Sequence, residues 1–115
     1  MDYNLCLHAD SKDPAILRLV LKNATNYLKG LPNEKFQIAI VANGPAVTLF
    51  TKNNSELYEM AKPLIEKGVI FKICANALND NQIKHDDLWI GCEVVDAGLV
   101  EIVHLQRKGY AYIKP

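Results

Sequence analysis

Apolar residues form two kinds of pattern along this chain, short continuous runs and stripes at helical spacing. Continuous runs occupy residues 36–42 and 69–73, and shorter strand-like segments lie at 3–8, 93–95 and 110–113. A run that is apolar at nearly every position is typical of a parallel strand covered on both faces. We therefore expect five short strands.

The stripes between these runs predict helices. Asp13 is a suitable capping residue and Pro14 suits a first helical position. We expect Gly30 to end this first helix. Its apolar stripe consists of Leu17, Val20, Leu21, Ala24 and Leu28.

Further stripes predict two more long helices. Ser55 is the expected cap of the second, Pro63 is expected to kink or split it, and Gly68 closes it. Its predicted buried stripe is Leu57, Met60, Ala61, Leu64 and Ile65. The last helix precedes Gly109, and its predicted apolar side is Leu99, Ile102, Val103 and Leu105. Short helices are expected over 46–50 and after Cys74.

Strands and helices alternate throughout the 115 residues. Alternation indicates a parallel sheet between helix layers. The expected architecture is a three-layer α/β/α sandwich with a five-stranded, mainly parallel sheet, formed by residues 1–115 as a single domain. The order of the strands does not follow from the sequence.

Charge and motifs narrow the function. Thirteen basic residues balance thirteen acidic ones, so no overall basic field attracts nucleic acid or a membrane surface. The first eight residues lack the features of a signal peptide, and we expect a cytoplasmic protein with reduced thiols. Three widely spaced cysteines show no metal-ligand spacing, and no nucleotide-binding motif is present. We expect no metal and no organic cofactor.

The carboxyl ends of parallel strands are where such sheets bind ligands. Four predicted strand ends carry suitable residues, at 8–10, 43–45, 74–76 and 96–98. Cys74 is the predicted catalytic residue, because the start of a helix favours the reactive thiolate. The alternative is a thiol that only packs in the core, which is common for free cysteine. Cys6 and Cys92 are expected to be packing residues.

Four further residues are expected to line one crevice with Cys74, and they are His8, Asn43, Gly44 and Asn76. His8 is a potential base toward the thiol, but its position slightly favours the alternative of a surface or hydrogen-bonded histidine. Gly44 allows close backbone approach. His85 is expected in the loop after the Cys74 helix, where a solvated position is favoured over one that covers the crevice. His104 is expected on the last helix, facing solvent or a partner chain.

Two apolar segments lack a core stripe to join. Residues 110–113 are apolar, and Trp89 and Ile90 lie in a predicted loop. Exposed apolar groups tend to mark interfaces. We therefore expect a homo-oligomer, with the C-terminal segment or the 82–92 loop at a contact.

Four segments resemble the DsrE/DsrF-like family of small sulfur-relay proteins, in its single-domain branch. They are residues 8–10, 41–45, 68–76 and 105–115. The resemblance implies a five-stranded α/β/α domain assembled as a trimer or hexamer. It also implies that the cysteine matching Cys74 accepts sulfur as a persulfide and passes it on, and that His8 and Asn43 lie near it.

The leading hypothesis is thus a sulfur carrier or sulfurtransferase-like protein with sulfur donor and acceptor proteins as partners. One alternative is a small-molecule or protein-binding module of the same fold, in which Cys74 is a pocket residue. Another is a purely structural oligomer subunit. Thiol reactivity separates the first from the others, because a carrier needs an accessible thiolate.

Overall fold

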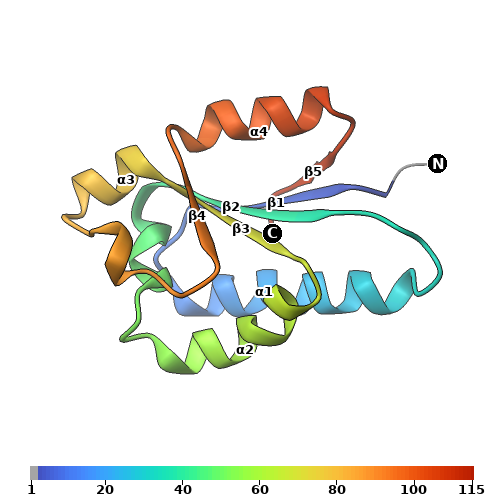
Figure 1. Ribbon diagram of the computed structural model, residues 1–115, viewed down its shortest axis with the longest axis horizontal. Helices are drawn as coiled ribbons and strands as arrows, with labels where there is room; N and C mark the ends of the chain where they lie inside the picture. Colours follow the sequence, from blue (N-terminus) through green and yellow to red (C-terminus); the bar gives the residue numbers. More distant parts are fainter. Residues whose placement is uncertain (1–2) are drawn as a thin grey trace.

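A computed structural model describes residues 3–115 and contains one five-stranded sheet. Residues 1–2, part of the segment expected not to be a signal peptide, lie outside the described residues. All neighbouring strands are parallel, in the order β4-β3-β2-β1-β5 (Figure 1). The strands are β1 (Leu5–Ala9), β2 (Ile38–Ala42), β3 (Ile70–Cys74), β4 (Cys92–Val95) and β5 (Ala111–Ile113). The predicted α/β class and parallel sheet are confirmed.

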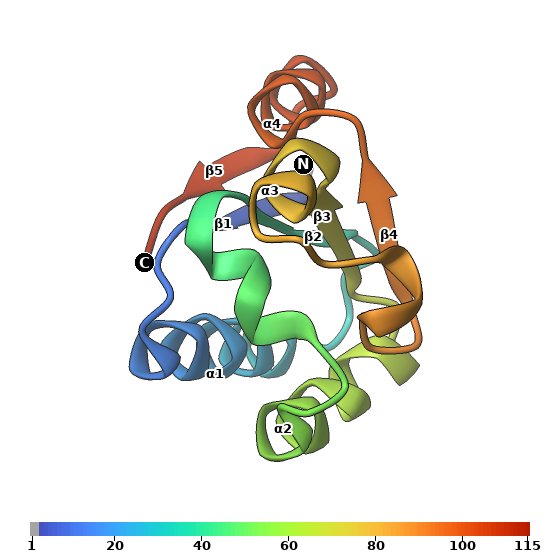
Figure 2. The same cartoon turned by 90° about the vertical axis from the view of Figure 1, so that its left-hand side faces the viewer.

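Helices cover both faces of the sheet. Helices α1 (Pro14–Gly30) and α2 (Ser55–Glu66) lie on one face and α4 (Gly98–Arg107) lies on the other (Figures 1 and 2). The chain winds outward from β1 to β4, and α4 then carries it back across the sheet to β5. This reversal places α4 on the opposite face, as right-handed crossovers require.

Short helices complete the connections. The 3₁₀ helix η1 (Gly44–Phe50) follows β2, α3 (Ala75–Asp80) follows β3, and η2 (His85–Asp87) precedes β4. Helix α3 stands at the end of the sheet where the strands finish (Figure 1). Both η1 and α3 therefore begin at strand ends, where the sequence analysis placed the chemistry.

Each face of the sheet has its own apolar cluster. The larger one joins the sheet to α1, α2 and η1, and includes Leu7, Ile40 and Phe71 from the strands. The smaller one lies under α4 and consists of Cys6, Ala39, Val41, Ile102 and Leu105. Since side chains alternate along a strand, odd positions of β1 face α1 and even positions face α4.

Helix starts follow the sequence signals in one case and depart from them in another. Asp13 caps α1, where its carboxylate accepts a hydrogen bond of 2.9 Å from the Ala15 amide, and Pro14 is the first helical residue. At α2 the expected cap Ser55 is wrong, because Ser55 is already helical and Asn54 precedes the helix. The Asn54 side chain instead donates to the Thr48 carbonyl at 3.0 Å. Helix α2 continues through Pro63 and is not split.

The predicted stripes were too wide at three positions. Met60 on α2 is 40% exposed, and Leu99 and Val103 on α4 are 62% and 44% exposed. The remaining expected core positions of α4, Ile102 and Leu105, are buried. Each helix touches the sheet along a narrow line, so the flanks of its apolar stripe remain in solvent.

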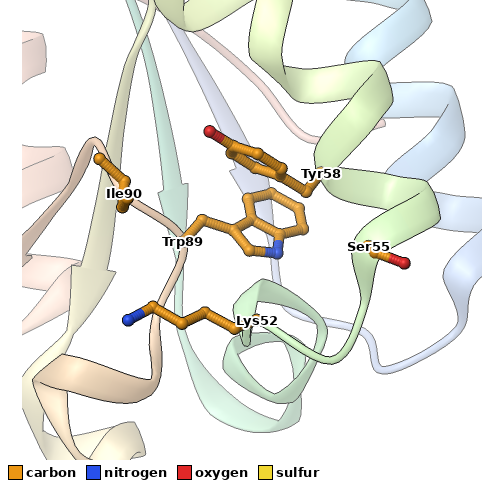
Figure 3. A pocket seen from close by; sticks show the side chains of 5 residues that line it. All are labelled: Lys52, Ser55, Tyr58, Trp89 and Ile90. Atoms are coloured by element: carbon orange, nitrogen blue, oxygen red, sulfur yellow. The ribbon is translucent and has the colours of Figure 1, made fainter.

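The prediction that Trp89 does not join the core is wrong. Its side chain is only 3% exposed and its ring lies 5.0 Å from that of Phe50 and 5.7 Å from that of Tyr58. The indole Nε1–H donates to the Thr51 carbonyl at 2.8 Å. Trp89 also lines a hollow of about 200 Å³. Figure 3 shows its ring between the side chains of Tyr58 and Lys52. Ile90 beside it is 78% exposed, as expected.

None of the helices within residues 3–115 combines the length and apolar character that crossing a bilayer demands.

Candidate functional site

Three neighbouring strands bring polar side chains to one edge of the sheet. His8 lies near the end of β1, Asn43 directly follows β2, and Cys74 is the last residue of β3. The backbone N–H of Asn43 donates to the Ala9 carbonyl at 3.1 Å, which extends the pairing of β1 and β2 beyond the end of β2. By strand alternation, His8 and Cys74 point to the same face of the sheet as α4.

Cys74 lines a cavity of about 250 Å³. Its residue is 6% exposed, and it stands at the point where β3 turns into α3. The cavity wall carries one carboxylate, from Asp80, and no lysine or arginine. Its lining residues are Asn43, Gly44, Cys74, Asn76, Ala77, Asp80, Ala97, Gly98 and Leu99.

Gly98 lies close to two side chains of this cavity, those of Asn43 and Cys74. It is the first residue of α4, and a Cβ placed on it would lie 3.0 Å from the Asn43 Cβ and 3.3 Å from the Cys74 Cβ. Such distances are shorter than ordinary carbon contacts, which begin at about 3.5 Å. The backbone of α4 therefore approaches Asn43 and Cys74 as closely as a residue without a side chain allows.

His8 is buried behind Asn43 and is fully hydrogen-bonded. It is 7% exposed, and its Nε2 lies 2.8 Å from the Asn43 Oδ1. Its Nδ1 lies 2.6 Å from the Tyr112 hydroxyl of β5. His8 is not part of the cavity lining, so the structure places it one hydrogen bond away from the wall that Asn43 forms.

The structure thus brings Asn43, Gly44, Cys74 and Asn76 to one cavity and connects His8 to it through Asn43. Sequence reasoning missed Tyr112, Asp80 and Leu99. Asp80 and Leu99 follow strand ends by several residues and carry no distinguishing pattern. Tyr112 was treated only as part of an apolar segment, and its pairing with β1 depends on the strand order.

The other two thiols are held in their neutral form. Burial raises the pKa of Cys6 to about 11, with a smaller contribution from the carboxylate of Glu101 and an opposing one from Lys72. Burial also raises the pKa of Cys92 to about 12. Neither residue lines the Cys74 cavity. Both match the expectation that they are packing residues.

The remaining histidines lie elsewhere. His85 is exposed on η2 and does not line the cavity. His104 is exposed on α4, with Nδ1 3.9 Å from the Glu101 carboxylate, which itself binds Lys72 at 2.7 Å. No group of three or more histidine, cysteine, aspartate or glutamate side chains within residues 3–115 is arranged to hold a metal ion.

A parallel α/β sheet with a cysteine in a cavity at its carboxyl edge defines a class of small thiol-bearing α/β proteins. A family model for the DsrE/DsrF-like family matches residues 5–115. The chain therefore belongs to the DsrE/DsrF-like family.

Solved structures that share this fold include MTH1491 and the ychN protein. MTH1491 from Methanobacterium thermoautotrophicum, described as a protein of unknown function, is 33% identical, with a TM-score of 0.91 over 99% of this chain and 100% of that one. The ychN protein from E. coli is 16% identical, with a TM-score of 0.67 over 98% of this chain and 99% of that one, and shows the shared fold alone. The comparison with curated proteins produced no match.

Proposed function

We propose that this protein is a cytoplasmic sulfur carrier, or sulfurtransferase-like protein, in which Cys74 holds sulfur as a persulfide. The observation that carries the proposal is the position of Cys74 in a cavity at the carboxyl edge of the sheet, in a chain of the DsrE/DsrF-like family. The proposal treats residues 1–115 as one domain and needs neither a metal nor an organic cofactor.

The proposed reaction moves one neutral sulfur atom between thiols. The Cys74 thiolate attacks the outer sulfur of a donor persulfide, R–S–SH. A new S–S bond forms at Cys74 while the donor S–S bond breaks, and the donor leaves as the thiolate R–S⁻ with the electron pair of that bond. Attack needs the ionised thiol, because the thiolate is the nucleophile in exchange at sulfur. The transfer involves no external oxidant.

The surroundings of the three thiols favour Cys74 as the acceptor. Cys6 is completely buried and Cys92 starts the edge strand β4, and burial raises the pKa of both. At neutral pH almost none of either thiol is ionised. Cys74 alone of the three borders a cavity large enough for the end of a persulfide donor.

The test is mass spectrometry after anaerobic exposure to glutathione persulfide. The wild-type protein should gain sulfur, and peptide mapping should place it on Cys74. Cys74→Ser should abolish the gain, whereas the matched variant Cys92→Ser should keep it. Uptake that survives in Cys74→Ser, or modification of Cys92 alone, contradicts the proposal.

A binding module is the second candidate function, and the low exposure of Cys74 favours it. A thiol that is 6% exposed in a cavity with mostly apolar lining is also suited to contact a bound small molecule or peptide. Iodoacetamide separates the two proposals. A carrier requires Cys74 to be alkylated faster than Cys6 and Cys92 near neutral pH, and a binding module does not.

A further inference from the structure

Three hydrogen-bonded side chains connect the edge strand β5 to the Cys74 cavity. The Tyr112 hydroxyl lies 2.6 Å from His8 Nδ1, and His8 Nε2 lies 2.8 Å from Asn43 Oδ1. Asn43 lines the cavity beside Cys74. These side chains, here called the Tyr112–His8–Asn43 chain, come from the segments that end β1, follow β2 and form β5.

For a neutral His8, the partner atoms of its two ring nitrogens set the direction of the protons in the Tyr112–His8–Asn43 chain. The amide oxygen of Asn43 only accepts, so His8 Nε2 carries the proton of this bond. In the neutral imidazole Nδ1 then has a lone pair, and the Tyr112 hydroxyl donates to it. Burial raises the pKa of Tyr112, while Lys114 nearby opposes that change, so this hydroxyl keeps its proton at neutral pH.

The orientation of Asn43 follows from this arrangement. With Oδ1 bound to His8, the other half of the planar amide, the Nδ2–H₂ group, is left for the cavity. It makes no hydrogen bond to any residue in the described range 3–115.

We infer that Tyr112 and His8 are positioning residues that hold the Asn43 amide with its N–H₂ group toward Cys74, where it donates to the anionic sulfur. The inference rests on the proposed function and adds to it the group that stabilises the negative charge on the sulfur. Transfer from R–S–SH leaves Cys74 as the persulfide Cys74–S–SH and the donor as R–S⁻. The outer S–H of Cys74 then loses its proton to solvent, and the resulting anion Cys74–S–S⁻ accepts a hydrogen bond from a donor of this kind. The cavity wall has no cationic side chain to replace Asn43.

Removal of the Tyr112 hydroxyl should free the Asn43 amide to change its orientation, and it alters no residue that lines the cavity. In Tyr112→Phe, Nδ1 loses its donor, and the imidazole can move its proton from Nε2 to Nδ1. Nε2 would then accept, and the Asn43 amide would turn to donate to it. The amide oxygen would face the sulfur instead, and two acceptors repel each other.

The first measurement is independent of sulfur chemistry. Long-range ¹H–¹⁵N correlation of ring nitrogens at pH 8 reports which nitrogen of His8 bears the proton. The wild type should show the proton on Nε2, and Tyr112→Phe should show it wholly or partly on Nδ1. Tyr58→Phe removes an equivalent hydroxyl far from the site, beside Trp89, and should leave the His8 signals unchanged.

The second measurement is the reaction rate of Cys74 with iodoacetamide and with glutathione persulfide. Tyr112→Phe should lower both rates by roughly 3- to 10-fold, the value of one ordinary hydrogen bond, while Tyr58→Phe keeps the wild-type rates. His8→Leu should lower them at least as far. His8→Gln, whose amide can still donate to Asn43, should recover most of the loss, and a purely structural role for His8 would give no such recovery in folded variants.

The outcomes separate this inference from the proposed function. If the wild type takes up no sulfur but Tyr112→Phe still moves the His8 proton and slows alkylation, sulfur transfer is wrong and the positioning role stands. If Tyr112→Phe matches the wild type in the His8 signals and in alkylation rate, the positioning role is wrong, whether or not sulfur is taken up.

Discussion

At the residue scale, the protein contains one thiol beside a cavity and two thiols whose ionisation is suppressed by burial. This difference has a consequence for stability that is independent of any function. Burial raises the thiol pKa in the folded protein to about 11 for Cys6 and to about 12 for Cys92, from an ordinary pKa of 9.0. Above pH 9.0 the unfolded chain therefore binds fewer protons than the folded one.

We predict that the free energy of unfolding falls as the pH rises above the ordinary thiol pKa of 9.0. Each thiol contributes a slope of up to about 1.4 kcal/mol per pH unit, and below pH 9.0 this contribution is constant. Urea unfolding at several pH values between about 8 and 10.5 measures the slope. Cys6→Ala should give a shallower slope than the wild type, and an unchanged slope would show that Cys6 is not the group responsible.

A second prediction concerns Gly98, which packs against both Asn43 and Cys74. A methyl group at this position meets the two Cβ atoms at 3.0 and 3.3 Å, so Gly98→Ala should lower stability by about 1–2 kcal/mol through overpacking. It should also slow alkylation of Cys74, because the methyl group lies between the two side chains.

Gly30→Ala is the matched control, since no atom lies within 4 Å of the added carbon. It should leave the alkylation rate unchanged and keep or raise the stability. Equal effects of the two substitutions on Cys74 alkylation would contradict the close approach of α4 to the site.

At the scale of elements, α4 is fixed to the sheet by a charged contact as well as by its small apolar cluster. Lys72 of β3 and Glu101 of α4 form an ion pair of 2.7 Å, and each side chain is 17% exposed. Removal of Lys72 leaves the Glu101 carboxylate largely buried, with the exposed imidazole of His104 at 3.9 Å as a weaker neighbour. Removal of both leaves an apolar contact of similar size.

We therefore predict that Lys72→Met alone lowers the free energy of unfolding by about 2–3 kcal/mol. The double variant Lys72→Met/Glu101→Leu should recover most of this loss. A double-mutant cycle by urea unfolding measures the coupling. Additive losses in the double variant would mean that the ion pair contributes little to the position of α4.

The sequence predicted the elements well because most local signals act over a few residues. Asp13 and Pro14 mark the start of α1, and the apolar runs mark the strands. Helical spacing alone cannot say how wide a stripe will be buried, which explains the exposed positions of Met60 and Val103. Helical spacing also cannot show which residues will cover an isolated aromatic side chain. Trp89 packs against Phe50 and Tyr58, which belong to other elements of the fold.

The candidate site was predictable in part for the same reason. Cys74, Asn43 and Gly44 end strands or begin the following turns, and parallel strands end at one edge. Tyr112 could not be found this way. Its contact with His8 needs β5 to pair with β1, and that neighbour relation is a property of the strand order.

At the scale of the whole molecule, apolar side chains remain exposed on α4, on β5 and near the start of β4. They are Leu99, Val100, Val103, Tyr112, Ile113 and Ile90. Because β5 is an edge strand with all three residues exposed, this side of the sheet is open to another chain. Trp89, by contrast, is buried in the core, so we no longer expect it at the contact between subunits.

We predict a homo-oligomer, a trimer or a hexamer, with Ile90 or the β5 segment at the contact. At least one of the variants Ile113→Asp and Ile90→Asp should lower the assembly mass measured by light scattering at micromolar concentration, because it places a charge in the apolar interface. Leu19→Asp, on the outer side of α1, is the control and should not change the mass. A monomeric wild-type protein would contradict the prediction.

The hydrogen bond between His8 and Tyr112 joins residues 104 positions apart. On a ribosome, β1 to β4 are made before Tyr112, so Cys74 is already in place at the end of β3 in the chain while His8 still lacks this partner. The Asn43 amide acquires its fixed orientation only when β5 docks beside β1. The tuning of the thiol by Asn43 therefore depends on a long-range contact that involves one of the last elements of the chain to be made.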